Sequence, residues 1–463
     1  MDNIGQYLEN AKKATVEFSK YSQIQVDKII KEVYLAGFKN RILLAKMAVE
    51  ETGIGRWEDK VTKNILATKY IYEDIKNLKT VGVISEDKAL GIIEVAQPVG
   101  PILAIVPSTN PSSTVMFKIL IALKTRNPII ISSPNKAKNV CSYTAELLYK
   151  AALKAGAPKY CIQWTKDSNR EQTKRLMSDK RLALILATGG KSLVNAAYSS
   201  GIPALGVGPG NVPVLIENSF NTELAIKKIL LSKTFDNGTI CASEQSIIVE
   251  KRNMQRALKA LEKYGAYIVP HDEIKSLEEI VYDKEREMMS SSIVGKTADF
   301  IAKKANLNAP INTSVLVVKQ TDVGKEHPLS SEILAPVIAI YEADDFQDAL
   351  RVCSKINNYG GKGHTASIFS NDENKIIEYS LKMNAGRIIV NSPSAQGAVG
   401  GLYNNLTPSL TLGCGTGGHN STTDNITAKH LLNIQRIAKP KNNSKRAKYK
   451  LSLEKEKIVD MVE

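Results

Sequence analysis

Cys241 is the residue of this sequence whose position most clearly allows covalent chemistry. It lies between a turn-forming Asp-Asn-Gly at 236–238 and an apolar run at 247–249 that predicts a buried strand. A thiol that leads from a loop into a strand can be held rigid and still face a cleft, where donors or positive charge favour the thiolate. The competing interpretation is a small buried core residue. The surroundings of Cys241 must decide between the two.

Strands alternate with helices around this cysteine. After several amphipathic helices within residues 5–80, two β-type runs within 90–107 are separated by a break at 97–100. This order is typical of parallel, doubly wound sheets, which bind ligands at the carboxyl ends of their strands. Further strands are predicted at 128–132, 182–186, 212–216, 314–318, 336–341, 366–369 and 387–390, and helices at 113–125, 137–154, 171–177, 223–234, 346–356 and 374–383.

The turn Thr188-Gly189-Gly190 lies between a predicted strand and a helix that begins at Lys191. The N-terminus of such a helix offers free N–H groups to an anion such as pyrophosphate. None of the predicted strand-to-helix turns carries a GxGxxG fingerprint, and the Gly-rich segment 413–420 lacks the lysine and Ser/Thr of a P-loop. The pattern alone therefore predicts a nucleotide-binding α/β domain without specifying the nucleotide.

The composition is that of an ordinary globular protein of two or three domains. The 463 residues are too many for one small core, and 43% of them are hydrophobic and 24% charged. The five cysteines show no CxxC and no Cys/His ligand spacing, so we expect a reducing, cytoplasmic setting with neither disulfides nor a metal site. Without an apolar signal-peptide core or a run of about 18 apolar residues, neither secretion nor membrane insertion is expected.

The formal net charge of +15 is concentrated near the C-terminus. Residues 436–457 hold nine Lys or Arg and two Glu, a net +7. No basic platform with interleaved aromatic residues accompanies this charge, so nucleic-acid binding is not expected. We predict that 439–450 is a flexible basic linker and that 451–463 is a short amphipathic helix.

Seven motifs occur in a fixed order along about residues 5–438. They are VPSTNPSSTVMFK (106–118), ILATGGKSLV (185–194), GVGPGNVPV (206–214), FDNGTICASEQS (235–246), SEILAPV (331–337), GGKGHTASIF (360–369) and SPSAQGAVGGLYNNLTPSLTLGCGTGGHNS (392–421). Together they resemble the aldehyde dehydrogenase superfamily, and most of all its CoA-acylating branch and the aldehyde dehydrogenase half of the bifunctional aldehyde-alcohol dehydrogenases. The resemblance implies the fold of that family, with two doubly wound α/β domains and a small β oligomerisation arm.

The resemblance also implies a division of the chain. An NAD(P)-binding domain is expected at 1–211 with arm strands near 88–101, a catalytic domain with Cys241 at 212–405, and a return to the coenzyme domain and arm at 406–438. The arm would add strands to a neighbour's sheet in a homodimer or homotetramer. The helix at 451–463 resembles peptides that carry relatives into bacterial microcompartments, where it would bind shell or cargo proteins. The alternatives are a helix docked on the enzyme itself and a frayed terminus.

Roles for the active-site residues follow from the same resemblance. Cys241 matches the nucleophile that attacks the aldehyde to form a thiohemiacetal, and Asn110 matches the amide that stabilises the oxyanion together with the Cys241 N–H. Glu332 matches the glutamate that holds the nicotinamide ribose. His364 matches a histidine suspected of assisting thiol transfer. For Asn110, Glu332 and His364 the alternatives are a turn former, a strand-end acid and a structural histidine.

The coenzyme implied by the resemblance is NAD, with NADP as the alternative. Lys136 stands where hydrolytic relatives carry a glutamate, and a glutamate would repel a 2′-phosphate whereas a lysine would not. The implied coenzyme-binding residues are Ser108, Thr109, Ser133, Pro134, Lys136, Thr188, Gly189, Gly190, Gly206, Val207, Gly208, Glu332 and Leu334.

The segment 206–213 differs from the hydrolytic pattern in a way that bears on the reaction. Hydrolytic relatives carry Glu-Leu-Gly-Gly-Lys there, and the glutamate activates water, but this chain has no carboxylate in the segment. We therefore expect the Cys241 thioester to react with CoA and to release the acyl-CoA of a short aldehyde, acetaldehyde or propionaldehyde, reversibly. We also expect that Gly206→Glu restores hydrolysis. The alternatives are a hydrolytic aldehyde dehydrogenase and a non-catalytic relative of the fold.

Overall fold

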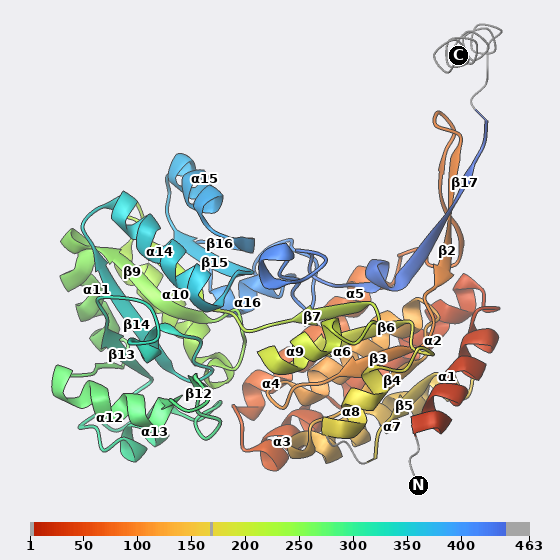
Figure 1. Ribbon diagram of the computed structural model, residues 1–463, viewed down its shortest axis with the longest axis horizontal. Coiled ribbons are helices and arrows are strands. Elements are labelled where there is room, and N and C mark those ends of the chain that lie inside the picture. Colours follow the sequence, from red (N-terminus) through yellow and green to blue (C-terminus); the bar gives the residue numbers. More distant parts are fainter. Residues whose placement is uncertain (1–3, 167–169, 441–463) are drawn as a thin grey trace, which may run out of the picture.

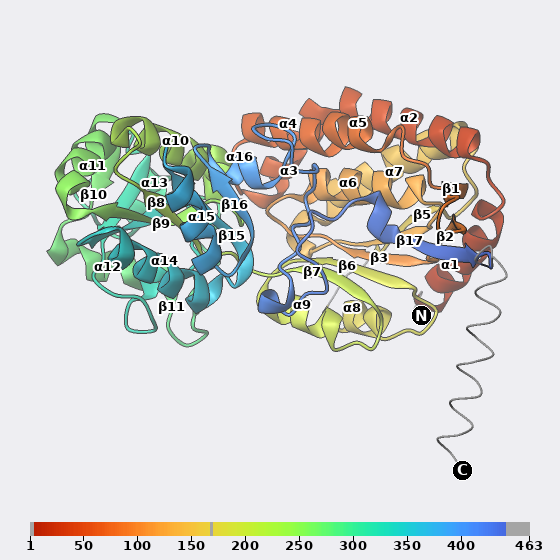
Figure 2. The same ribbon diagram turned by 90° about the horizontal axis from the view of Figure 1, so that it is seen from above.

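The computed structural model describes residues 4–166 and 170–440. Two α/β lobes lie side by side, and a narrow sheet projects from one of them (Figures 1 and 2). The expected helix at 451–463 lies outside the described residues, as does all of the expected linker except Lys439 and Pro440. In the described part of the chain, no helix is both long enough and apolar enough to span a membrane.

Among the described residues, the first lobe is built on a five-stranded parallel sheet of order β5-β4-β3-β6-β7. β3 (Ile102–Ile105) and β4 (Ile129–Ser132) are buried along their whole length, as expected for central strands that are covered on both faces. The other strands are β5 (Ile162–Trp164), β6 (Leu184–Thr188) and β7 (Ala204–Val207).

Helix α6 (Pro111–Lys124) is the central helix of this lobe, and every one of its residues is buried. It packs against α2 (Gln23–Lys39) and α7 (Lys138–Lys154), which form its cover. Since Asn110 is the N-cap of α6, this burial fixes where Asn110 lies. The remaining elements of the lobe are α1 (Ile4–Phe18), α3 (Arg41–Thr52), α4 (Trp57–Ile65), η1 (Leu66–Tyr70), α5 (Ile71–Ile75), η2 (Asn135–Ala137), α8 (Arg170–Met177) and α9 (Lys191–Tyr198).

The second lobe, as far as the structure describes it, carries a seven-stranded parallel sheet of order β10-β13-β14-β9-β8-β15-β16. The central strand β9 (Glu244–Glu250) is buried throughout and begins three residues after Cys241. Its other strands are β8 (Val212–Ile216), β10 (Ala266–Ile268), β13 (Val315–Lys319), β14 (Val337–Ala343), β15 (Gly363–Phe369) and β16 (Ala385–Val390). The accompanying elements are α10 (Thr222–Thr234), η3 (Phe235–Gly238), α11 (Lys251–Lys263), α12 (His271–Val281), β11 (Tyr282–Asp283), β12 (Met288–Met289), α13 (Ala298–Lys304), η4 (Pro328–Ser330), α14 (Phe346–Gly360), α15 (Glu373–Lys382) and α16 (Ser394–Ala398).

The projecting sheet is antiparallel and joins segments from both ends of the chain. β2 (Ile92–Pro98) pairs with β1 (Gly82–Asp87) on one side and with β17 (Leu432–Ala438) on the other. The chain returns from the second lobe to this sheet through η5 (Thr416–Gly418) and η6 (Ala428–Leu431). Two parallel α/β lobes and a small β arm confirm the expected fold class.

The positions of most elements agree with the sequence pattern, and the differences have local causes. The strand expected at 247–249 begins earlier, at Glu244. The apolar pattern did not predict this start, because Glu244, Gln245 and Ser246 are polar although they are buried. β5 was not predicted because its three residues give no periodic signal, and β7 was not predicted because Gly206 interrupts its apolar run. The unpredicted helix α11 does show helical spacing of its buried Met254, Leu258 and Leu261.

Candidate active site

The loop that carries Cys241 joins α10 to β9 in a strained conformation. Asp236, Asn237 and Gly238 have φ angles of 49°, 51° and 72°. Left-handed non-glycine residues cost free energy and persist only where their surroundings hold them. A Cβ on Gly238 would lie 2.9 Å from the Ala335 carbonyl oxygen, so the close approach there requires glycine. The loop is thus held in one conformation that displays Cys241 at the head of the central strand.

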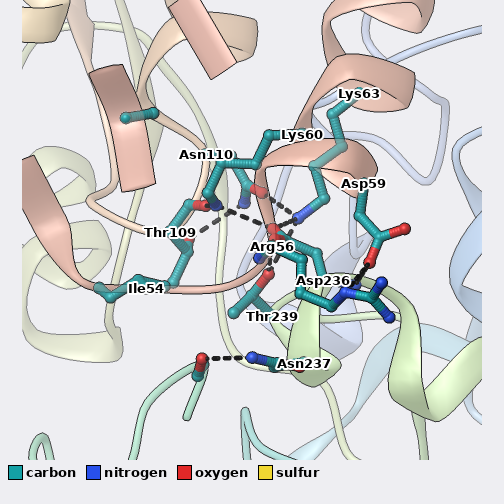
Figure 3. A network of polar contacts seen from close by, with 12 residues as sticks. Ile54, Arg56, Asp59, Lys60, Lys63, Thr109, Asn110, Asp236, Asn237 and Thr239 are labelled. Atoms are coloured by element: carbon teal, nitrogen blue, oxygen red, sulfur yellow. Dashed lines mark hydrogen bonds and ion pairs between the residues drawn. The ribbon is translucent and has the colours of Figure 1, made fainter. Parts of the chain in front are cut away.

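Asp236 anchors this loop to the first lobe and is completely buried. Its carboxylate accepts hydrogen bonds from Lys60 and Lys63 of α4 and from the Arg56 backbone N–H (Figure 3). Burial opposes the ionisation of Asp236, but Lys63 and Lys60 hold its pKa below the ordinary value. An ionised aspartate between two lysines therefore fixes the Cys241 loop against the first lobe.

Cys241 and His364 are in direct contact. His364 Nε2 lies 3.1 Å from Cys241 Sγ, and His364 Nδ1 lies 2.9 Å from Thr365 Oγ1. Burial and the charge of Arg387 lower the pKa of His364 to about 3. Burial and the charge of Glu332 raise the pKa of Cys241 to about 12. The resting pair is therefore a neutral thiol that donates to a neutral imidazole.

The buried Arg387 of β16 holds the backbone around His364 and the Gly-rich turn. Its guanidinium donates to the carbonyl oxygens of His364 at 2.9 Å and Thr423 at 3.0 Å, and also to that of Gly413. The positive charge of Arg387 partly offsets the rise in the pKa of Cys241 that burial and Glu332 cause. Arg387 thus positions the histidine and favours negative charge on the nucleophile.

Gly210 passes directly over the nucleophile. A Cβ on this residue would lie 2.2 Å from the Cys241 carbonyl oxygen and 3.2 Å from His364 Cγ, so only glycine fits. Its N–H donates to Glu332 Oε1 at 2.9 Å. Burial raises the pKa of Glu332 to about 7, although the Gly210 N–H and Lys233 act in the opposite direction. Glu332 therefore lies beside the nucleophile loop with its carboxyl group bound to Gly210.

A cavity opens beside Cys241 and contains four of the expected site residues, Asn110, Thr188, Val207 and Cys241 itself. Among the described residues, those that line it include no carboxylate, and Lys63 is the one that carries a charge. The rest of the lining is mainly apolar: Leu66, Phe235, Ile240, Val399, Leu402, Leu410 and Leu412. The cavity can therefore accept a small uncharged substrate against the thiol.

The structure corrects the expectation that a glutamate at position 206 would reach this cavity. A Cβ on Gly206 would lie 2.9 Å from Val194 Cγ1 and 3.1 Å from the Tyr198 hydroxyl, so a side chain there meets α9. The next residue along β7, Val207, is the one that lines the cavity, because successive side chains of a strand face opposite sides. A longer side chain at position 207 would start from the cavity wall itself.

Most of the implied coenzyme-binding residues lie at the carboxyl edge of the five-stranded sheet. The strands β4, β3, β6 and β7 are neighbours, so the segments that follow them lie along one edge. These segments hold Ser108 and Thr109 after β3, Ser133, Pro134 and Lys136 after β4, Thr188, Gly189 and Gly190 at the end of β6, and Gly206, Val207 and Gly208 at the end of β7.

The turn between β6 and α9 fits the pyrophosphate of a dinucleotide. Gly190 is the N-cap of α9 and makes no side-chain cap, and a Cβ on Gly190 or Gly208 would meet nothing within 4 Å. The buried Thr188 Oγ1 has no hydrogen-bond partner in the described part of the chain. An open helix N-terminus and an unpaired hydroxyl are suited to an anionic ligand, so the residues present fit NAD or NADP.

Glu51 supplies a carboxylate at the turn that follows β4. It lies on α3 and accepts the backbone N–H groups of Asn139 at 2.8 Å and Val140 at 2.7 Å, in the first turn of α7. The expected residue Lys136 is exposed nearby. Glu51 thus brings a carboxylate from a different helix to the first turn of α7, which the sequence pattern did not reveal.

Leu334, one of the implied coenzyme-binding residues, does not line the cavity. It precedes β14, and its carbonyl oxygen accepts from the Gly295 N–H. His419, in the Gly-rich segment 413–420, is exposed and does not line the cavity either. Within residues 4–166 and 170–440, no three His, Cys, Asp or Glu side chains are grouped so as to hold a metal ion.

Lys60 and Lys63 were missed because a basic pair three residues apart on an amphipathic helix usually lies on a solvated face. Here that face of α4 is buried against Asp236.

Comparisons with known proteins agree with this geometry. The model of the aldehyde dehydrogenase family matches residues 2–403. The bifunctional aldehyde-alcohol dehydrogenase AdhE of Escherichia coli K12 is 43% identical over 440 residues, which are 94% of this chain and 49% of that protein. The chain therefore spans about half the length of the first curated relatives that it matches.

Solved structures match over nearly their whole length. An acetylating aldehyde dehydrogenase from Geobacillus thermoglucosidasius is 43% identical with a TM-score of 0.92, and the match covers 96% of this chain and 97% of that one. A propionaldehyde dehydrogenase from the fucose utilisation microcompartment of Clostridium phytofermentans is 26% identical with a TM-score of 0.86, covering 95% of this chain and 98% of that one. On the family match and these similarities, the chain belongs to the aldehyde dehydrogenase family.

Proposed function

We propose that this chain is a CoA-acylating aldehyde dehydrogenase, which oxidises a short aldehyde with NAD and CoA to an acyl-CoA and NADH, reversibly. The observation that carries the proposal is the wall of the Cys241 cavity, which includes no carboxylate among the described residues, while His364 contacts the thiol. The similar acetylating and propionaldehyde dehydrogenases support the same reaction.

Attack on the aldehyde begins at the Cys241–His364 pair. As Sγ bonds to the carbonyl carbon, the thiol proton passes to His364 Nε2, to which it is already hydrogen-bonded at 3.1 Å. The Asn110 amide, at the N-cap of α6 and on the wall of the cavity, would stabilise the oxyanion of the thiohemiacetal together with the Cys241 N–H. In a site shielded from water such a donor contributes about 3–4 kcal/mol.

Ser108, Thr109, Ser133, Pro134 and the Thr188–Gly190 turn would hold the coenzyme along the carboxyl edge of the first sheet. The bound nicotinamide supplies a hydride acceptor for the carbon that Cys241 has captured. Glu332 would hold the nicotinamide ribose. In the described structure its carboxyl group is bound to the Gly210 N–H, so coenzyme binding is expected to compete with that hydrogen bond.

Release of the acyl group requires a second nucleophile. Water is a poor one here, since the described residues that line the cavity include no carboxylate, and loss of a general base slows a step by about 10²- to 10⁴-fold. Before this step His364 would release the first proton to solvent. The CoA thiol would then attack the thioester while His364 Nε2 takes its proton, and the C–Sγ bond would break as that proton returns to Cys241 Sγ.

The lining of the cavity favours acetaldehyde or propionaldehyde as the substrate. Its walls are mainly apolar, and the one charged residue among the described lining residues, Lys63, is already paired with Asp236. An aldehyde with a second, anionic group would lack a free cation in this wall, because the charge of Lys63 is compensated.

NAD is the proposed coenzyme, with NADP as the alternative. Although Lys136 would tolerate a 2′-phosphate, the Glu51 carboxylate on the α7 N-terminus would repel it and already occupies the N–H groups that could bind it.

The arm supports assembly into a homodimer or homotetramer. β16 is an edge strand of the seven-stranded sheet in the described structure, and the groove beside it exposes Leu231, Tyr403 and Leu406. Strands from a neighbour's arm could extend that sheet.

Targeting through 451–463 to shell or cargo proteins, in the cytoplasm or within a microcompartment, is a separate proposal. Its test is co-purification with such proteins before and after deletion of 440–463. Loss of aldehyde oxidation on deletion would instead mark the tail as a part of the enzyme.

Mass spectrometry tests the proposed reaction through its intermediate. With aldehyde and NAD but no CoA, the intact chain should gain one acyl group that maps to Cys241, and added CoA should remove it as acyl-CoA. A chain that returns to its unmodified mass in water at the rate of turnover would identify the hydrolytic alternative. A chain in which Cys241 never reacts would favour a non-catalytic relative.

A further inference from the structure

Lys63 lies where the buried cluster around Asp236 meets the substrate cavity. Lys60 and Lys63 are three residues apart on α4 and both side chains are 3% exposed (Figure 3). Both ammonium groups contact Asp236 Oδ2, but they differ in their other partners. Lys60 Nζ donates to the Thr109 carbonyl oxygen at 2.9 Å, whereas Lys63 Nζ donates to Asn110 Oδ1 at 2.6 Å.

All three N–H donors of the Lys63 ammonium are used in hydrogen bonds. Its third partner is Thr239 Oγ1 at 2.9 Å, and the Thr239 hydroxyl in turn donates to Asp236 Oδ2 at 2.7 Å. An ammonium group has three N–H donors and no acceptor, so Asn110, Asp236 and Thr239 use all of them. The direction of each of these hydrogen bonds is therefore fixed.

This arrangement determines which end of the Asn110 side chain faces the cavity. Only the amide oxygen can accept from an ammonium, so Oδ1 must point to Lys63 and Nδ2 must point away. Nδ2 donates one N–H to Thr109 Oγ1 at 3.0 Å, which leaves the second N–H for another acceptor. Asn110 and Cys241 line the same cavity, so that acceptor can be an oxygen bound to the carbon on Sγ.

We propose that Lys63 is a positioning residue, which holds the Asn110 amide so that its remaining N–H faces the oxyanion formed on Cys241. The inference rests on the proposed nucleophilic role of Cys241 and is independent of whether CoA or water accepts the acyl group. Without Lys63 the amide can rotate and present its oxygen to the oxyanion, and loss of one such donor slows the step by about 10²- to 10³-fold.

Lys60 offers a matched control within the same helix. Lys60→Met and Lys63→Met each remove one buried ammonium from Asp236 and keep an apolar side chain of similar length. A loss of loop anchoring should therefore affect both variants, and their melting temperatures should fall by similar amounts. Only Lys63→Met removes the contact with Asn110.

The test uses acylation of Cys241 by p-nitrophenyl acetate without coenzyme, followed as a burst of p-nitrophenolate. The S–C bond forms through a tetrahedral oxyanion, the ester C–O bond breaks, and the thiol proton passes to His364. Lys63→Met and Asn110→Ala should each lower the burst rate by about 10²-fold, and the double variant should be no slower than Asn110→Ala. Lys60→Met should lower the burst rate only by the factor by which it lowers the rate of Cys241 alkylation by iodoacetamide.

Alkylation of Cys241 by iodoacetamide separates positioning from structural damage, because no oxyanion forms in that reaction. Lys63→Met should be alkylated at the parent rate, and Lys63→Leu, which also has no donor for Asn110 Oδ1, serves the same purpose if the methionine variant does not fold. Three outcomes would each overturn the positioning role. In the first, Lys63→Met lowers the alkylation rate and the burst rate by the same factor, and in the second it leaves the burst rate unchanged. In the third, the double variant is slower than Asn110→Ala by the full factor seen for Lys63→Met alone. Absence of a burst in the parent chain would overturn the nucleophile itself, and the inference with it.

Discussion

The Cys241 thiol and the His364 imidazole form a neutral reactive pair in the resting site. Burial places the pKa of Cys241 near 12 and that of His364 near 3, so at neutral pH neither group is charged. The proton of the thiol is therefore transferred only when the substrate arrives. The positive charge of Arg387 acts against the rise in the pKa of Cys241 but does not cancel it.

The pH dependence of Cys241 alkylation tests this neutral pair. Because the pKa of the thiol is raised to about 12, the thiolate fraction should rise about tenfold per pH unit between about pH 7 and 9. The rate of reaction with iodoacetamide should rise in the same proportion, with no plateau in that range. A plateau below about pH 7 would show a thiolate–imidazolium pair and contradict the account.

Replacement of the nucleophile separates chemistry from coenzyme binding. Cys241→Ser should abolish acyl-CoA formation and acyl-CoA reduction, because a serine hydroxyl is a far weaker nucleophile. NAD binding, measured by calorimetry, should stay nearly unchanged, since the coenzyme edge lies on the other lobe. Residual turnover above about 1% would show that the reaction does not pass through this residue.

A base restored at position 207 should convert the chain toward hydrolysis. Val207 faces the cavity, so Val207→Glu places a carboxylate beside the thioester, and NADH formation without CoA should rise at least about tenfold. Val207→Gln is the control of equal size without a base. If both variants behave like the parent chain while folded, the missing carboxylate does not explain the dependence on CoA.

The sequence predicted which residues form the site, but it did not predict which way every side chain faces or which distant residues meet. The motif order was sufficient to single out Cys241, Asn110 and His364, and the structure places all three at one site. The motif did not reveal which of Gly206 and Val207 faces the cavity, because that depends on the register of β7. Nor could spacing show that Lys63 meets Asp236, 173 residues later, since this contact exists only after the lobes pack.

At the scale of elements, one end of α7 carries a carboxylate beside the proposed coenzyme site. Glu51 reaches from α3 to the first turn of α7 and binds two of its N–H groups. The sequence predicted α7 well. It could not predict that Glu51 of α3 binds the N-terminus of α7, because local patterns do not show how two helices pack.

Substitution of Glu51 should change coenzyme preference. Glu51→Gln keeps a similar shape and removes the negative charge, so the preference for NAD over NADP, as a ratio of kcat/KM values, should fall about tenfold. Glu50→Gln, one residue earlier on the same helix, is the control. An unchanged ratio, with a folded protein, would show that Glu51 is only a helix cap.

At the scale of the whole molecule, the two lobes must pack against each other for the site to exist. Cys241 belongs to the second lobe and Asn110 to the first, and the Asp236 cluster joins them. The arm adds a third component that makes few contacts with its own lobes and exposes Val83 and Ile437. An arm of this form is expected to pair with another copy of the chain.

Sedimentation tests that expectation. The chain has a mass of 50.7 kDa. For a dimer or tetramer of closed symmetry, sedimentation should give a particle mass two or four times that value. Replacing Val83 and Ile437 by aspartate should weaken assembly while the melting temperature of the lobes changes little. A single-chain mass at all concentrations would contradict the role assigned to the arm.

The fate of the Cys241 thioester is the central claim, and NADH production in the absence of CoA tests it most directly. Enzyme mixed with aldehyde and NAD should form about one NADH per Cys241 in a rapid burst and then stop, because the described residues that line the cavity include no carboxylate to activate water. Addition of CoA should start continuous turnover, with one acyl-CoA for each further NADH. Steady NADH production without CoA, with a carboxylic acid as the product, would contradict the account.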